Sequence, residues 1–222
     1  MIQSVPNVSR EEIEERQRRA KITDGLVRSE APLRHLRNKI EPQGKWGECY
    51  SRLAGMLGTG FLVVLMGKRW TGKTQMATEL IRCAVRQAVE KDRQPKVRFV
   101  TIIQFFMAIK ESYKPDGPTE SAQVNSFAAF NLLVIDEAHE RSDTDWERRL
   151  LNEMLNRRYN AMKDTLLMTN MTPEAFAKSI GPTIHRRIEE TGLEIVCDWP
   201  SFRDPDDQDH RSENRELRVV SV

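Results

Sequence analysis

The stretch FLVVLMGKRWTGKT, residues 61–74, decides the fold class. Its first six residues form an unbroken apolar run between Gly60 and Gly67, which is typical of a strand buried on both faces. Its last eight residues match the pattern GxxxxGK[ST] of a phosphate-binding loop, or P-loop, which needs a buried strand before it and a helix after it. An amphipathic segment follows residue 74, so we predict an α/β fold with a nucleotide at this strand-to-helix turn.

The residues of the loop suit a triphosphate. Gly67 allows a tight turn out of the strand, and Gly72 allows backbone N–H groups to approach phosphate oxygens. Lys73 is placed to reach the β- and γ-phosphates, and the Thr74 hydroxyl is a ligand for Mg²⁺. Trp70 stands where such loops usually hold a small residue, and we expect its ring to point away from the phosphates. The predicted ATP-binding residues are Gly67, Lys68, Arg69, Trp70, Thr71, Gly72, Lys73 and Thr74.

Two more apolar runs end in polar residues that suit hydrolysis. NLLVIDEAH, residues 131–139, places Asp136 at a strand end as a second Mg²⁺ ligand beside Thr74, and Glu137 as the group that polarises the attacking water. TLLMTN, residues 165–170, ends in Asn170, which we predict to orient that water, although it also suits a turn into the next helix.

The letters DEAH, residues 136–139, also occur in a helicase family that needs two tandem motor domains. This chain has room for one such domain, so Ala138 and His139 are interpreted as coincidental.

Apolar runs at 98–103 and 193–197 raise the number of expected strands to five. They alternate with amphipathic segments, which predicts a parallel sheet flanked by helices on both faces.

We place the boundaries of a helical, partner-docking segment at 1–45, an ATPase domain at 46–203 and a polar tail at 204–222. Ser9 and Glu12 have the spacing of a capping box and predict a helix from about residue 10 to residue 22. That helix is a docking element, with Ile13 and Ile22 as anchors, or a solvated arm.

Composition and charge bear on nucleic-acid binding, on metal or disulfide sites and on localisation. The net charge of +2 does not by itself indicate nucleic-acid binding. Arg-Arg pairs at 18–19, 148–149, 157–158 and 186–187 leave a local basic groove open, although solvated faces or ion pairs are the simpler interpretation. The 3 cysteines lack metal or disulfide spacing. Without a membrane-length apolar run or a signal peptide, we expect a cytoplasmic protein.

The order of motifs resembles that of the AAA+ ATPases of the DnaC/IstB group, from about residue 31 to residue 203. The ending WPSFR, residues 199–203, is similar to the close of DnaC-type helicase loaders, whereas transposition helper ATPases of the IstB type usually lack this tryptophan. The resemblance implies an AAA+ ATPase that uses ATP and Mg²⁺. It also implies that the protein binds a replicative DNA helicase, forms homo-oligomers on it and assists its placement on single-stranded DNA. The short N-terminal region suggests a phage-encoded form.

The same resemblance implies roles for arginines. Arg187, or else Arg186, acts in trans as an arginine finger, and Arg203 matches the sensor-2 arginine that contacts phosphate within its own subunit. Ion pairs with nearby acids are the alternative for each. For DNA, Lys110 and Lys114 are the candidate contacts. The alternative is that Phe105, Phe106 and Ile109 only belong to the core, which we expect for the two phenylalanines. A transposition helper and a small-molecule kinase remain as other functions, although no arginine-rich lid follows the core.

Overall fold

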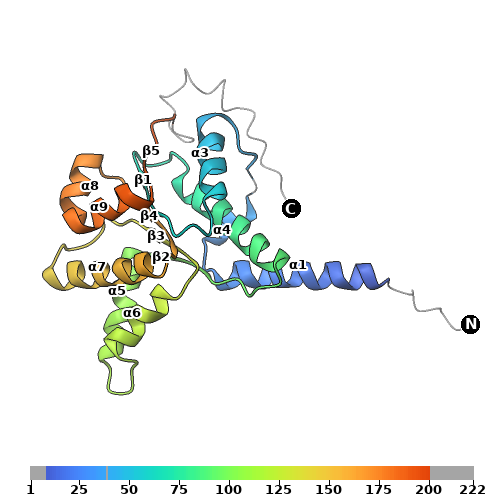
Figure 1. The fold of residues 1–222 in the computed structure, drawn as a ribbon, viewed down its shortest axis with the longest axis horizontal. Coiled ribbons are helices and arrows are strands. Elements are labelled where there is room, and N and C mark those ends of the chain that lie inside the picture. The colour runs from blue at the N-terminus through green and yellow to red at the C-terminus, as the bar shows by residue number, and fades with distance from the viewer. Residues whose placement is uncertain (1–8, 39, 201–222) are drawn as a thin grey trace, which may run out of the picture.

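The computed structural model describes residues 9–38 and 40–200. Its centre is a sheet in the order β2-β3-β4-β1-β5, and every neighbouring pair is parallel, which confirms the predicted sheet (Figure 1). The described strands are β1 Leu62–Met66, β2 Val97–Thr101, β3 Leu132–Asp136, β4 Asp164–Met168 and β5 Glu194–Val196.

Helices cover both faces of the sheet (Figure 1). One layer holds α1 Arg10–Arg28, α2 Leu33–Arg37, α3 Gly44–Gly55 and α4 Lys73–Glu90. The other holds α5 Ile102–Lys110, the 3₁₀ turn η1 Glu111–Tyr113, α6 Glu120–Ala128, α7 Asp145–Asn160, α8 Pro173–Ile180 and α9 Pro182–Thr191. Within the described ranges, no helix is at once long and apolar enough to span a membrane.

The side chains of β1 alternate between two cores, one on each face. Val63 and Leu65 pack with the layer of α3 and α4, whereas Val64 packs with the layer of α5 to α9. All five residues of β1 are buried, as expected of a strand covered on both sides. Period-two alternation within an unbroken apolar run therefore holds the two helical layers against one sheet.

The second strand ends earlier than its apolar pattern suggests. The Thr101 hydroxyl accepts a hydrogen bond from the Gln104 amide, at 3.2 Å, and the Gln104 side chain accepts one from the Thr101 amide, at 2.9 Å. This capping box ends β2 and starts α5, so Ile102 and Ile103 are helical rather than extended. Phe105, Phe106 and Ile109 of α5 are buried, which confirms their place in the core.

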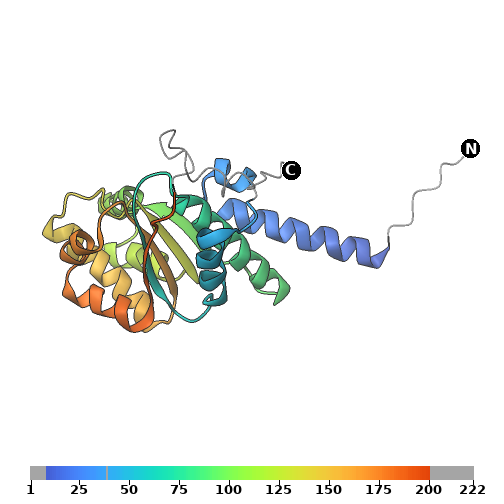
Figure 2. The same ribbon diagram turned by 90° about the horizontal axis from the view of Figure 1, so that it is seen from above.

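Helix α1 begins at the predicted capping box and is longer than expected. The Ser9 hydroxyl accepts from the Glu12 amide at 3.2 Å, and the Glu12 carboxylate accepts from the Ser9 amide at 2.9 Å. The helix continues to Arg28, and its C-terminal half packs on α4. Gly25 lies so close to α4 that an added Cβ would stand 2.9 Å from Val85. The N-terminal half extends away from the body (Figure 1, Figure 2).

This packing changes the expectation for the two isoleucines of α1. Ile22 packs against the core on the α4 side, so it is not free to anchor a partner. Ile13 lies on the projecting half and is 45% exposed. Of the two predicted anchors, Ile13 therefore remains a candidate, whereas Ile22 does not.

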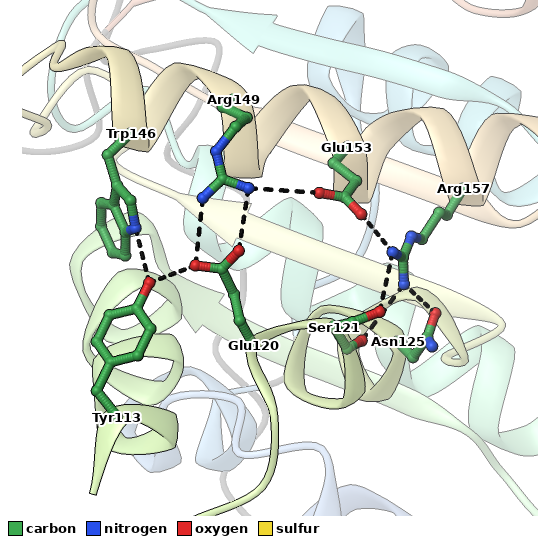
Figure 3. Close-up of polar contacts among 8 residues, drawn as sticks. All are labelled: Tyr113, Glu120, Ser121, Asn125, Trp146, Arg149, Glu153 and Arg157. Atoms are coloured by element: carbon green, nitrogen blue, oxygen red, sulfur yellow. Dashed lines mark hydrogen bonds and ion pairs between the residues drawn. The ribbon is translucent and has the colours of Figure 1, made fainter.

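A polar network joins η1 and α6 to α7 at the surface (Figure 3). Arg149 donates to both Glu120 oxygens, at 3.0 and 3.2 Å, and Tyr113 donates to the same carboxylate. Arg157 donates to Glu153 and to the Asn125 side chain. Because these pairs are partly solvated, each contributes at most about 1 kcal/mol to stability.

Arg158, next to Arg157, is instead fully buried, which corrects the simpler interpretation of this Arg-Arg pair. Burial lowers the pKa of Arg158 to about 9, so the guanidinium stays charged at neutral pH. It ties the end of α6 to the start of β4. Its hydrogen-bond acceptors are the carbonyl oxygens of Phe127, Ala128, Phe130 and Asp164 and the hydroxyl of Thr165.

We predict that Arg158→Met lowers the free energy of unfolding by about 3–5 kcal/mol, because it leaves buried acceptors without a donor. Arg157→Met is the matched control on the same helix and should cost no more than about 1 kcal/mol. Urea unfolding followed by circular dichroism at pH 7 compares the two variants. Equal losses would show that the buried guanidinium has no special structural role.

Candidate nucleotide-binding site

The loop between β1 and α4 needs glycine at both ends. At Gly67 the backbone has φ 133°, and an added Cβ would lie 2.8 Å from the carbonyl oxygen of Cys197. Gly72 has φ 79° and precedes the first residue of α4, Lys73. Left-handed geometry of this kind favours glycine. The loop therefore ends at a helix N-terminus, where free backbone N–H groups favour an anion.

The side chain of Lys73 reaches back into the loop. Its Nζ donates to the carbonyl oxygens of Gly67, at 2.8 Å, and Lys68, at 2.7 Å. Burial lowers the pKa of Lys73. The Thr71 hydroxyl also donates to the Lys68 carbonyl, at 3.1 Å. The ammonium group is thus held where a phosphate bound by the loop would meet it.

Trp70 lies on the outside of the loop, as expected. It is 54% exposed, and its backbone has φ 68°. For a residue with a Cβ, this left-handed conformation costs on the order of 1–2 kcal/mol. Contacts elsewhere in the loop must offset that strain.

The Thr74 hydroxyl and the Asp136 carboxylate meet across the sheet edge. Thr74 donates to one Asp136 oxygen at 3.3 Å, and the Glu137 amide donates to the other at 2.8 Å. Burial raises the pKa of Asp136. A hydroxyl and a carboxylate oxygen at this spacing fit the oxygen ligands that Mg²⁺ prefers, with water completing its shell.

Glu137 has an unusual backbone for a glutamate, with φ 54°. Ala138, the next residue, is buried, and its amide donates to the carbonyl of Met168 at 2.9 Å. This bond to β4 holds the turn that carries Glu137. Burial first, and then the negative charges of Glu140 and Asp136, raise the pKa of Glu137. A carboxylate with a raised pKa is a better proton acceptor for a water nucleophile.

Asn170 and His139 are in contact, a pairing that the sequence did not predict. The His139 ring nitrogens lie 3.3 Å from the Asn170 side-chain nitrogen and 3.5 Å from its amide nitrogen. Because β4 lies between β1 and β3, Asn170 leaves the sheet between the P-loop strand and the strand of Asp136. The only signal for His139 in the sequence is its position three residues after Asp136.

Two tryptophans that motif reasoning did not connect with the loop donate to its carbonyls. Trp46 of α3 donates to the Gly72 carbonyl at 3.3 Å, and Trp199, beyond β5, donates to the Thr71 carbonyl at 2.6 Å. Neither residue has a sequence spacing that relates it to the loop.

The two candidate finger arginines, Arg187 and Arg186, lie apart from the P-loop. Arg187 on α9 donates to Asn156 and stacks over Tyr159, 4.6 Å from the ring centroid. Tyr159 is at the end of α7, just before β4 begins, and therefore at the edge of the sheet opposite the P-loop. Arg186 pairs with Glu190 at 2.9 Å. Arg203 falls outside the described residues.

Comparison with known proteins identifies a family that this chain matches. The model of the IstB-like ATP binding protein family matches residues 57–183, more than half of the chain. The replicative helicase loader DnaC of Escherichia coli K12 is 25% identical over 141 residues, which are 63% of this chain and 55% of that protein. The chain thus spans about half the length of the curated relatives it matches.

Solved structures share the fold. A crystal structure of the DnaC helicase loader matches with a TM-score of 0.52 at 17% identity, over 70% of this chain and 92% of that one. AMPPCP-bound DnaA from Aquifex aeolicus matches with a TM-score of 0.57 at 21% identity, over 79% of this chain and 55% of that one. With its P-loop, its parallel sheet and the family match over residues 57–183, the chain belongs to the IstB-like ATP-binding proteins and has the AAA+ fold of DnaC and DnaA.

Proposed function

We propose that this protein is an ATPase that helps to load a replicative DNA helicase onto single-stranded DNA. The observation that carries the ATPase part is the convergence of Lys73, Thr74 and Asp136 at one edge of the sheet, with Glu137 directly after Asp136. The loader part rests on the curated relatives named DnaC.

Each residue at this edge has one task in the proposed reaction. Lys73 exchanges its loop carbonyls for phosphate oxygens, while Thr74 and Asp136 hold Mg²⁺, which neutralises phosphate charge when bound. Glu137 accepts a proton from the attacking water. Asn170, held by His139, orients that water.

The projecting half of α1 is the proposed docking element for the helicase. It is almost entirely charged, and the exposed Ile13 is its apolar anchor. An isolated helix of this length is marginal by itself, so a partner surface or the body must support it. Its C-terminal half already has that support from α4.

Single-stranded DNA is proposed to meet the end of α5. Lys110 lies over the Trp146 ring, 5.4 Å from its centroid, and Lys114 pairs with Glu111. Both lysines are exposed, and Tyr113 beside them is 58% exposed. Phosphate contacts at such positions make binding weaken as salt rises.

We predict that Glu137→Gln binds ATP with parental affinity but hydrolyses it at least about 100-fold more slowly, because the general base is lost. Lys73→Ala, in contrast, should lose binding of a fluorescent ATP analogue. Binding titrations and phosphate-release assays on the two folded variants separate these effects. Parental hydrolysis by Glu137→Gln would remove Glu137 as the base.

Capture experiments test the loader function. The protein should bind the replicative helicase of its own genome in the presence of ATP, and Ile13→Asp should reduce capture at least tenfold while leaving ATP binding unchanged. Arg16→Asp, a charge change on the same exposed helix, is the control and should have a smaller effect. Capture of a transposase instead of the helicase would favour the transposition helper, whose family the chain shares.

An arginine finger would act between subunits, because Arg187 lies at the edge opposite its own P-loop. We predict that Arg187→Ala lowers hydrolysis by roughly 10³-fold or more, as for trans arginines in other NTPases. Arg187→Ala mixed with Lys73→Ala should recover part of the activity at mixed interfaces. Arg186→Ala is the neighbouring control. A mixture that assembles yet stays inactive would contradict the trans role.

A further inference from the structure

Two indole N–H groups approach the P-loop from parts of the chain outside its strand–loop–helix unit. Trp46, in the first turn of α3, is buried and donates to the Gly72 carbonyl at 3.3 Å. Trp199, three residues after β5, is partly buried and donates to the Thr71 carbonyl at 2.6 Å. The Lys45 and Asp198 side chains, each next to one of these tryptophans, form an ion pair at 3.7 Å.

The acceptor atoms matter because of the geometry of the peptide bond. In a planar trans peptide the C=O and the N–H point in opposite directions. The Thr71 carbonyl shares its peptide plane with the Gly72 amide, and the Gly72 carbonyl shares its plane with the Lys73 amide. No peptide bond of the described chain is cis. A donor that fixes each carbonyl from behind therefore fixes the direction of the amide that faces the phosphates.

The backbone conformation of the loop also needs to be stabilised by contacts from outside the loop. Residues on both sides of Thr71 are left-handed, with φ 68° at Trp70 and 79° at Gly72. The Gly72 carbonyl already accepts from the Met76 amide at 2.9 Å, so Trp46 adds a second bond to it. Within the described part of the chain, the Thr71 carbonyl accepts its hydrogen bond from Trp199. The contribution of Trp199 should therefore exceed that of Trp46.

We propose that Trp199 and Trp46 are positioning residues for ATP, which orient the Gly72 and Lys73 amides toward the phosphates. This inference rests on the proposed ATPase function and names how the site is held. Trp46 belongs to α3 and Trp199 to the segment after β5. Nucleotide affinity therefore depends on how these two segments pack against the loop. The backbone at Cys197 supports that packing, since its amide donates to the Met66 carbonyl at 2.7 Å.

The alternative is that both rings are only part of the core. Trp46 stacks on Tyr50 with ring centroids 5.9 Å apart, and Trp199 packs against the same core cluster. Trp→Phe variants keep an aromatic ring and remove the N–H, so they test the two roles. Trp146→Phe is the matched control, because its N–H donates to the Tyr113 hydroxyl, at 2.9 Å, and not to the loop.

The experiment compares Trp199→Phe, Trp46→Phe and Trp146→Phe with the parent in full-length protein. The loss of one net hydrogen bond raises Kd for a fluorescent ATP analogue and KM for ATP by roughly three- to tenfold in Trp199→Phe, and by less in Trp46→Phe. Because the bond acts on binding, kcat should stay within about twofold of the parent. Trp146→Phe should keep the parental Kd.

Two further measurements separate positioning from packing. Hydrogen–deuterium exchange of the P-loop peptide should accelerate in Trp199→Phe at temperatures well below its melting transition. Benzothienylalanine at position 199 keeps the size of the indole and lacks its N–H, so it should reproduce the higher Kd if Trp199→Phe does not fold. A lower melting temperature with an unchanged Kd in these variants would overturn the proposal. A parent that does not bind ATP would instead refute the proposed function.

Discussion

In the sheet, β4 pairs in parallel with β1 on one side and with β3 on the other. Because the three strands run in the same direction, their carboxyl ends share one edge, and the residues that follow them are brought together there. Along that edge the order is therefore Asp136 after β3, Asn170 after β4 and Lys73 after β1, although each comes from a different part of the chain. The alternation of buried side chains along β1 fixes the register of this arrangement, since a slip by one residue would exchange the two cores.

Most of the sheet could be predicted because its signals are local. An apolar run between two glycines identifies β1, and the P-loop pattern identifies the turn that follows. The end of β2 was missed because Ile102 and Ile103 continue the apolar run, while the Thr101 cap decides where the helix begins. The burial of Arg158 was missed for a related reason: its acceptors include carbonyls at the end of α6, just after α6 and on β4, which local charge patterns do not reveal.

The residues of the candidate site also divide into those that local motifs predict and those that only the fold brings together. Lys73, Thr74 and Asp136 were predicted from motifs, and the structure brings the Thr74 and Asp136 side chains within 3.3 Å. The indole donors were not found, because Trp199 is 128 positions from its acceptor residue and only the folded chain brings them together. His139 was set aside because the letters around it belong to another family, yet it lies against Asn170. Long-range contacts of this kind depend on strand order, which no local spacing encodes.

Helix α1 is attached to the body through the helix that begins in the P-loop. Its C-terminal half packs on α4, with Gly25 against Val85, and α4 starts at Lys73. From Gly25 to Ser9 the helix is roughly 24 Å long, at about 1.5 Å per residue. If α1 moves with α4, a tilt of α4 by about 5° would displace the free end of α1 by about 2 Å. A force applied at Ile13 would therefore be transmitted to the helix that begins in the P-loop.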